Sequence, residues 1–286
     1  MNDTPAVSVE HLSLRYGGVT ALDDVSLSVE RGSVLAVVGR NGAGKSSLLQ
    51  CMLGLIVPQS GNSQLLGCPS LDLTDDVKAR LGYVSQSPEL FEWLRVGEQI
   101  SLIGGLYPNW SERRARALCA RFSIADDMKV RALSLGEKQR LAIVIALAHQ
   151  PDLLVFDEPV ASLDPVGRRD FLRAFFEHEA RDGAPVTVVI SSHLLEDLER
   201  IATHVLFLEG GRIQLLGARD EISERVRLAV TAHPIAEQRG ILKRRQIAAD
   251  QWQHVVDTRT VANDALPPNT ALSALGLGDL FEALNT

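Results

Sequence analysis

The sequence predicts an α/β fold built around a mostly parallel β-sheet. Residues 34–38 (VLAVV) and 153–156 (LLVF) are apolar throughout, as in strands that are covered on both faces. Helical segments separate these strands from further largely apolar strands at 186–190 and 205–208. A glycine-rich loop at 39–46 lies between the first strand and a run of apolar residues at helical spacing. The sheet therefore contains a strand–loop–helix unit.

Composition limits the class of protein. A length of 286 residues indicates one large domain or two unequal ones, and 45% hydrophobic with 23% charged residues is typical of globular chains. The net charge of −7 argues against a broad basic surface for nucleic acid. The three cysteines lack metal-ligand spacing, which favours free thiols in a reducing cytosol. We expect no secretion signal and no membrane-spanning segment, because the longest apolar stretches, such as 141–148, are far shorter than the roughly 20 residues that a bilayer requires.

The segment before the glycine-rich loop, residues 7–39, is predicted to form strands and turns. Val25, Leu27 and Val29 alternate with polar residues, as expected for a strand with one buried face. A turn signal then precedes the apolar strand at 34–38.

The middle of the chain, about residues 87–140, is predicted to be mainly helical. Ser111 is a candidate N-cap. Apolar residues at helical spacing follow it, at Ala115, Leu118, Cys119 and Phe122. This periodicity predicts a helix with one buried face.

The character of the sequence changes after about residue 221. Three short strands and a closing helix are the candidate elements there, at 226–230, 240–248, 251–256 and 275–284. We therefore divide the chain into residues 1–221 and a small α+β domain at 222–286. The residues of this second domain indicate no chemistry.

Residues 39–46 (GRNGAGKS) match the pattern GxxxxGK[ST]. Glycines are needed there so that backbone N–H groups can face phosphate oxygens without an intervening side chain. Lys45 would reach the β- and γ-phosphates and Ser46 would ligate magnesium, while the helix that follows offers its positive N-terminal end. An ordinary glycine-rich turn is the alternative, which the strand before the loop and the helix after it disfavour.

A second motif follows a buried strand, in residues 153–159 (LLVFDEP). Asp157 is positioned to hold magnesium, directly or through water. Glu158 is positioned to orient or deprotonate an attacking water. A strand that ends in two acidic residues is by itself a common turn, and the phosphate-loop motif makes the catalytic interpretation the stronger one.

With these motifs in order, residues 7–217 resemble the nucleotide-binding subunits of ABC (ATP-binding cassette) transporters. Residues 133–137 (LSLGE) occupy the position of the family signature, and residues 162–164 (SLD) resemble its D-loop. The resemblance implies that Tyr16 stacks on adenine, that Gln86 contacts magnesium and that His193 contacts the γ-phosphate. Taken singly, Tyr16 and His193 are more often ordinary surface or core residues.

The resemblance implies a complete set of site residues. The implied catalytic residues are Glu158, His193 and Lys45, and the implied magnesium ligands are Ser46, Gln86 and Asp157. The implied nucleotide-binding residues are Tyr16, Gly39, Asn41, Gly42, Ala43, Gly44, Lys45, Ser46, Ser47, Gln86, Ser134, Gly136 and Asp164.

The resemblance also implies a fold and an activity. The fold is a P-loop NTPase core with a mostly parallel sheet, an antiparallel N-terminal β-subdomain, a helical subdomain at about 87–140 and a small C-terminal α+β extension. The activity is hydrolysis of ATP with Mg²⁺. Two subunits, either two copies of this chain or one with a homologous subunit, would hold ATP head to tail, and polytopic membrane permease subunits would attach them to the inner face of the cell membrane. No nucleic acid partner is expected.

The signature segment departs from the common LSGGQ pattern at Leu135 and Glu137. Ser134 and Gly136 retain the two main phosphate donors. The charge of Glu137 would weaken the capture of ATP unless Lys138 or Arg140 screens it. The alternative is that Glu137 points to solvent and has no effect.

Three functions remain open. The leading one is the ATPase subunit of an exporter, because residues 164–168 (DPVGR), the appended C-terminal segment and residues 277–284 (LGDLFEAL) are similar to those of type-2 ABC exporters. An importer ATPase is the second, and a soluble ABC ATPase of translation or DNA repair is the third. A membrane partner would contact Phe91, Trp93 and Leu94 near Gln86, unless these apolar residues belong to the core.

Overall fold

The computed structural model describes residues 4–177, 183–193, 198–199, 201–236, 238–262, 266–267 and 270–285. Its centre is a six-stranded sheet in the order β10-β9-β3-β8-β7-β6. Neighbouring strands from β9 to β6 pair in parallel, and only β10 is antiparallel to β9. The prediction of a mostly parallel sheet is thus confirmed. The strands are β3 (Val34–Val38), β6 (Leu81–Val84), β7 (Leu153–Asp157), β8 (Thr187–Ser192), β9 (His204–Glu209) and β10 (Arg212–Ala218).

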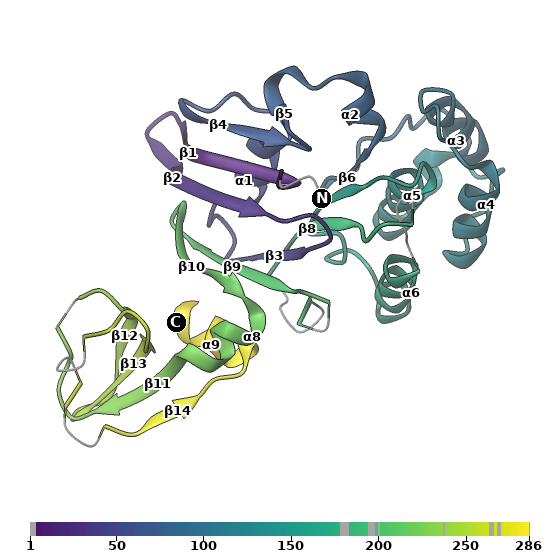
Figure 1. Ribbon diagram of the computed structural model, residues 1–286. Helices are drawn as coiled ribbons and strands as arrows, with labels where there is room; N and C mark the ends of the chain where they lie inside the picture. Colours follow the sequence, from purple (N-terminus) through teal and green to yellow (C-terminus); the bar gives the residue numbers. More distant parts are fainter. Residues whose placement is uncertain are drawn as a thin grey trace.

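An antiparallel sheet formed by the N-terminal part of the chain lies over one face of the central sheet (Figure 1). Its strand order is β2-β1-β4-β5. The expected antiparallel N-terminal β-subdomain is therefore present. The strands are β1 (Val7–Tyr16), β2 (Val19–Val29), β4 (Ser60–Leu65) and β5 (Cys68–Pro69).

Helices α3, α4 and α5 gather beside β6, the edge strand of the central sheet (Figure 1). Ser111 caps α4 as predicted, because its hydroxyl accepts a hydrogen bond from Arg114 N at 3.2 Å. The sequence predicts a mainly helical segment over about residues 87–140, but residues 87–95 and 122–129 are not helical, and Arg95 and Lys129 from these two stretches form an isolated antiparallel bridge. The helical elements between residues 45 and 176 are α1 (Lys45–Met52), η1 (Ser70–Asp72), α2 (Asp75–Ala79), α3 (Val96–Gly104), α4 (Glu112–Arg121), η2 (Val130–Ala132), α5 (Leu135–Ala148) and α6 (Pro165–Phe176).

Both faces of the central sheet are covered, as the apolar strands predicted. On β3, Ala36 and Val38 pack into the core that contains α5 and α6, whereas Leu35 and Val37 pack into the core beneath the N-terminal sheet. The strand therefore reads as a continuous apolar run because its alternate side chains enter two different cores.

The C-terminal part of the chain forms a second antiparallel sheet beyond the opposite edge of the central sheet, in the order β12-β13-β11-β14 (Figure 1). Three of its strands and its closing helix occur where the sequence predicts them. Strand β14 was not predicted, because it has three exposed residues and no apolar alternation. The elements are α8 (Arg219–Arg225), β11 (Val226–Thr231), β12 (Ile241–Ala248), β13 (Gln251–Asp257), β14 (Leu272–Ala274) and α9 (Leu277–Asn285).

Within the described residues, we find no helix whose length and hydropathy would let it cross a membrane.

Candidate functional site

The loop between β3 and α1 requires glycine at several positions. Gly42 and Gly44 have φ angles of 82° and 106°, which side chains rarely tolerate. A Cβ atom on Gly39 would lie 2.4 Å from the carbonyl oxygen of Leu208, and one on Gly44 would lie 2.4 Å from that of Ala21. The glycines predicted from the motif therefore serve two needs, a left-handed backbone and a close approach to neighbouring strands.

The loop and the start of α1 open onto a hollow of about 360 Å³. The first N–H groups of a helix have no partner within the helix, so those of α1 are available to an anion at this end. Tyr16 stands at the rim with 49% of its surface exposed. Residues that the sequence assigned to one site line this hollow together: Tyr16, Asn41, Gly42, Gly44, Lys45, Ser46, Ser47, Gln86 and Glu158.

Lys45 and Glu158, which line the hollow, form a connected cluster with His193. Lys45 Nζ lies 3.2 Å from Glu158 Oε1 and donates to the Gly39 carbonyl at 2.8 Å. Glu158 Oε2 lies 2.7 Å from His193 Nδ1. Only 6% of Lys45 and 4% of Glu158 are exposed. Two buried charges so close together compensate each other, and removal of either one leaves the other unpaired in a poorly solvated place.

Ser191 is part of the site although the sequence did not single it out. Its hydroxyl donates to Asp157 Oδ1 at 2.7 Å and accepts from the Glu158 N–H at 2.9 Å. Strands β7 and β8 pair in parallel with Asp157 opposite Ser191, which explains this contact. The signal available in the sequence was the pair of serines that ends the strand before His193.

Ser46, Gln86 and Asp157 line a common hollow next to the first one. They present a hydroxyl, an amide and a carboxylate, all of which are oxygen ligands suited to Mg²⁺. Among the described residues, no group of three or more His, Cys, Asp or Glu side chains could hold a metal ion. A set with one carboxylate nevertheless fits Mg²⁺, which usually keeps several waters and takes further ligands from substrate phosphates.

The signature segment caps its own helix. The Ser134 hydroxyl and the Ser134 N–H donate to the same Glu137 oxygen, at 2.7 Å and 2.8 Å, and the Glu137 N–H donates back to the hydroxyl at 3.3 Å. These hydrogen bonds lower the pKa of the Glu137 carboxyl, and the charge of Arg140 adds to this effect. Lys138 does not pair with Glu137, because its Nζ lies 2.6 Å from Glu92 Oε1. Glu137 therefore points neither to Lys138 nor freely to solvent, but back to Ser134.

Three of the predicted site residues belong to the starts of α5 and α6 and line neither the hollow of the phosphate loop nor the one next to it. Ser134 and Gly136 are at the start of α5, and a Cβ on Gly136 would lie 2.9 Å from the Ser162 carbonyl oxygen. Asp164 caps α6 by accepting a hydrogen bond from Gly167 N at 2.7 Å. Within one chain, the structure thus brings together the phosphate-loop half of the predicted site but not the signature half.

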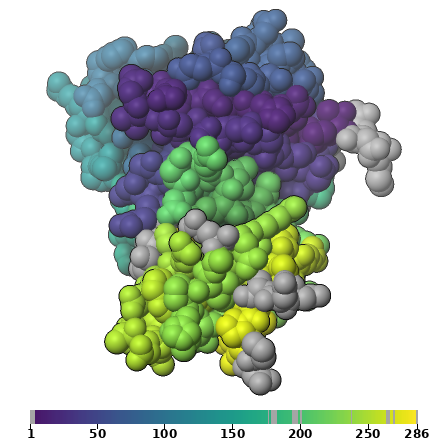
Figure 2. All heavy atoms as spheres, turned by 90° about the vertical axis from the view of Figure 1, so that its left-hand side faces the viewer, coloured from purple at the N-terminus to yellow at the C-terminus, as the bar shows by residue number. Residues whose placement is uncertain are grey.

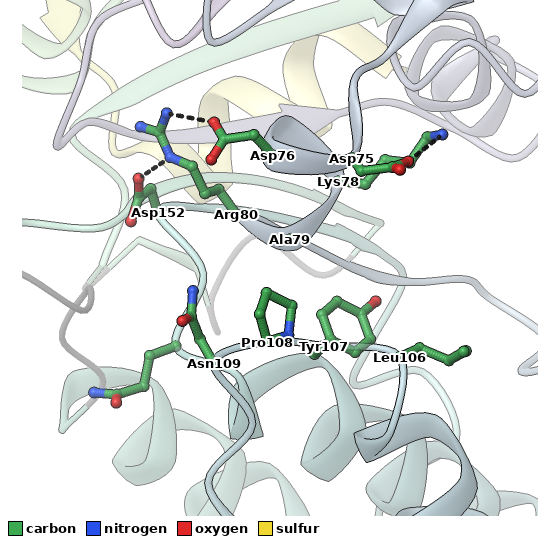
Figure 3. A pocket seen from close by; sticks show the side chains of 11 residues that line it. Asp75, Asp76, Lys78, Ala79, Arg80, Leu106, Tyr107, Pro108, Asn109 and Asp152 are labelled. Atoms are coloured by element: carbon green, nitrogen blue, oxygen red, sulfur yellow. Dashed lines mark hydrogen bonds and ion pairs between the residues drawn. The ribbon is translucent and has the colours of Figure 1, made fainter.

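Three neighbouring hollows near β6 are together called the groove here; Lys78 lines the first and second of them, and Tyr83 lines the second and third. In the first, which Gln86 does not line, Figure 3 shows Arg80 between Asp76 and Asp152, with Tyr107 and Pro108 on the opposite wall. Arg80 Nε lies 2.6 Å from Asp152 Oδ2, which fixes this wall. The hollow there measures about 930 Å³.

Two aromatic residues that closely follow Leu90, a lining residue of the groove, are exposed rather than part of the core. Phe91 is 37% exposed and Trp93 is 69% exposed, and their rings are 5.1 Å apart. Leu94 is half-buried. The core alternative is therefore wrong for Phe91 and Trp93.

Comparison with known proteins shows which proteins this chain is similar to. A family model described as "ABC transporter" matches residues 22–161. The chain is 34% identical over 220 residues to "Nod factor export ATP-binding protein I" of Ralstonia nicotianae, covering 74% of this chain and 67% of that protein. It is also 34% identical over 239 residues to "Nickel import ATP-binding protein NikO" of Rhodobacter capsulatus, covering 79% and 94% respectively. A solved "ATP binding subunit of ABC transporter" superposes with a TM-score of 0.69 at 29% identity, covering 77% of this chain and 92% of that one.

Proposed function

This chain belongs to the family of ABC transporter ATP-binding proteins, and we propose that a head-to-tail pair of such subunits drives export by hydrolysing ATP between them. The family supports the general activity directly: the chain is the ATP-binding and ATP-hydrolysing subunit of an ABC transporter. The roles of individual residues, the use of Mg²⁺, the docking site and the direction of transport are proposals.

The observation that carries the proposed mechanism is the buried contact between Lys45 and Glu158. In this arrangement each oxygen of Glu158 already has a partner, Lys45 on Oε1 and His193 on Oε2, so the carboxylate is less available to accept a proton from water. A nucleotide in the adjacent hollow would offer phosphate oxygens to Lys45 instead. Glu158 would then be free to orient or deprotonate the attacking water, with His193 beside the γ-phosphate. Binding of ATP would thereby activate the base.

Mg²⁺ fits beside this cluster. Ser46, Gln86 and Asp157 would hold it, and Ser191 fixes the orientation of the Asp157 carboxylate. When bound, the ion would neutralise charge on the phosphate oxygens. The remaining work belongs to the protein side chains, which orient water and hold the nucleotide.

A second subunit supplies what the first one lacks. Ser134 and the N-terminus of α5, a helix of 14 residues, lie outside the hollow of their own chain and can face an anion on another molecule. Because this chain carries both halves of the site, we propose that two copies suffice to form two complete sites. The γ-phosphate would then bind donors from both copies, and its loss on hydrolysis would weaken the pair.

Membrane subunits are the partners expected for a transporter ATPase, and we propose that they dock in the groove along β6. Gln86 lies at one end of this groove and also lines the hollow of the phosphate loop. A segment in the groove would therefore reach the nucleotide site through Ser46 and Gln86, which line both hollows. Exposed apolar side chains at Leu55, Leu71, Trp93 and Leu106 support this surface.

Export is favoured over import by the part of the chain that follows residue 221. The nickel-import relative is matched over 94% of its length, so it has little length left to correspond to the C-terminal sheet. The Nod factor export relative has a third of its length outside the match. The resemblance of residues 277–284 to type-2 exporters points the same way. Import remains the second candidate.

Crosslinking of the docking surface tests this proposal. A Trp93→Cys variant in a Cys68→Ser background carries a reactive thiol beside the groove, because Cys51 and Cys119 are buried. We expect this variant to crosslink to a polytopic membrane protein purified with it in detergent, and an Arg116→Cys variant on α4 to crosslink less. Association with ribosomes or DNA instead would support a soluble ABC ATPase.

A further inference from the structure

The turn between β9 and β10 packs against the phosphate loop. Gly211 N donates to the Ala43 carbonyl at 3.0 Å, and the Gly211 carbonyl accepts from Asp23 N at 2.9 Å. Leu208 limits the space at both ends of the loop, since Cβ atoms added to Gly39 and Gly44 would lie 2.4 Å from its oxygen and 3.4 Å from its Cδ2. The turn and the loop are therefore in direct contact, through one backbone hydrogen bond and close packing at Gly39.

The same turn is also joined to the C-terminal sheet. Lys243 on β12 places its Nζ 3.2 Å from Glu209 Oε1, and Glu209 is the last residue of β9. Gln214 donates to the other oxygen of the carboxylate. Figure 2 shows β9 and β10 between the N-terminal strands and the C-terminal sheet. Glu209, which forms the ion pair, is thus two residues before Gly211, which forms the hydrogen bond to the phosphate loop.

Both members of this pair are partly shielded from solvent. The Lys243 side chain is 27% exposed and that of Glu209 is 43% exposed. Lys243 is held by its place in the sheet, because it pairs across to Val255, a buried residue of β13. A lysine on a rigid strand fixes the carboxylate more firmly than one on a mobile loop would, since less side-chain and backbone entropy is lost on contact.

We propose that Lys243 is a positioning residue for the phosphate loop, through which the C-terminal sheet sets the affinity of the subunit for ATP. Lys243 touches no nucleotide; it holds Glu209, and the β9–β10 turn then holds Ala43 and the glycines of the loop in their binding geometry. The coupling is reciprocal by thermodynamic linkage, so bound ATP also orders the C-terminal sheet. A contact that restrains residues 222–286 would thereby change nucleotide affinity from a distance.

The test is ATP binding by calorimetry on the full chain. Lys243→Met removes the positive charge of the ion pair but keeps most of the aliphatic side chain. Glu209→Gln removes the negative charge. We expect each variant to raise the Kd for ATP about two- to fivefold, the range expected for a partly exposed ion pair. The double variant should be no weaker than either single one, because both remove the same contact. Lys243→Arg keeps the positive charge and should therefore retain the wild-type affinity for ATP.

A merely structural role predicts a different pattern. If Lys243 only stabilised the C-terminal sheet, Lys243→Met would lower the melting temperature and Glu209→Gln would leave ATP affinity unchanged. Positioning predicts a higher KM for ATP with kcat preserved in both variants. It also predicts that ATP slows hydrogen exchange at residues 241–248 in the wild type but not in Glu209→Gln. Arg116→Met serves as the control. It breaks an exposed ion pair on α4, in which Arg116 Nε lies 3.1 Å from Glu112 Oε1.

The inference rests on the proposed role of residues 39–46 in binding phosphate, and the experiment separates the two. A wild-type chain that binds no ATP would overturn the proposed function itself. A wild-type chain that binds ATP, with Lys243→Met and Glu209→Gln within 1.5-fold (roughly 0.2 kcal/mol) of it, would overturn only this inference. Equal losses in Arg116→Met would overturn it as well.

Discussion

The phosphate loop and the signature segment differ in how complete they are within one chain. Around the loop, Lys45, Glu158 and His193 already contact one another, and the two charged residues of the buried pair are almost inaccessible to solvent. In the signature segment, Ser134 bonds to its own neighbour Glu137, and Leu135 is 59% exposed. The difference teaches that one half of the site is preassembled for a nucleotide, whereas the other half is presented to a second molecule.

The largest effect is expected at the loop, from Glu158→Gln. The amide is isosteric but cannot accept a proton from water, so turnover should fall about a hundredfold or more. ATP binding should persist, because the phosphate contacts remain. Phosphate release by the purified variant measures turnover, with Glu112→Gln on α4 as the control. Full ATPase activity would exclude Glu158 as the base.

Lys45→Ala should affect both nucleotide and fold. ATP affinity should fall at least tenfold (about 1.4 kcal/mol), because a direct phosphate contact is lost. Stability should fall by about 3–5 kcal/mol, since Glu158 is left buried without its partner. Calorimetry and chemical denaturation measure the two effects. Adding Glu158→Gln should recover most of the stability and none of the affinity, and unaltered ATP binding would refute the phosphate cradle.

Ser134→Ala should separate the two halves of the site. ATP binding by the single chain should be unchanged, because Ser134 lies outside the loop hollow. ATP-dependent pairing of two chains should weaken about ten- to a hundredfold, since a hydrogen bond to a charged group is worth roughly 1.5–3 kcal/mol. Light scattering of the Glu158→Gln protein with and without Ser134→Ala measures pairing. A lower affinity of the single chain for ATP would show that the halves are not separate.

The smallest effect is expected from Glu137→Gln, which keeps a hydrogen-bonding cap and removes its charge. ATP-dependent pairing should strengthen about two- to fivefold, because a negative charge no longer faces the phosphate. Light scattering at a fixed ATP concentration measures it.

The pH dependence follows from the direction of the Glu137 shift. Hydrogen bonds from Ser134 hold its pKa below the ordinary glutamate value, so the cap contributes fully above that ordinary value and is lost only as the pH falls through the lowered one. Between pH 6 and 8 the carboxylate stays charged. ATP-dependent pairing of the wild type should therefore show no pH dependence due to Glu137 in that range, and a pH-dependent change in wild-type pairing that Glu137→Gln abolishes would contradict this.

The sequence predicts local features of this molecule better than contacts between distant segments. The loop glycines and the Ser111 cap follow from short-range rules and are present. The cap formed by Ser134 and Glu137 also has a local signal in the sequence, Ser-x-x-Glu, although this cap was not among the predictions.

Other contacts depend on the register of strands that are far apart in sequence. Asp157 meets Ser191 only because β7 and β8 pair in parallel with these residues opposite each other. Lys45 reaches Glu158 because β3 and β7 end at the same edge of the sheet, on either side of β8. The contact of Glu209 with Lys243 requires the placement of the whole C-terminal sheet, which no local pattern encodes.

Complementation between two defective chains tests the central claim most directly. Both chains carry Glu158→Gln; one adds Lys45→Ala, which disables its loop, and the other adds Ser134→Asp, which keeps a helix cap but repels phosphate. Neither chain should pair with itself in ATP, whereas an equimolar mixture should form a dimer with one intact site, visible as a doubled mass in sedimentation. A mixture that stays monomeric while Glu158→Gln alone dimerises, or a Lys45→Ala chain that dimerises by itself, would contradict a nucleotide shared between two copies.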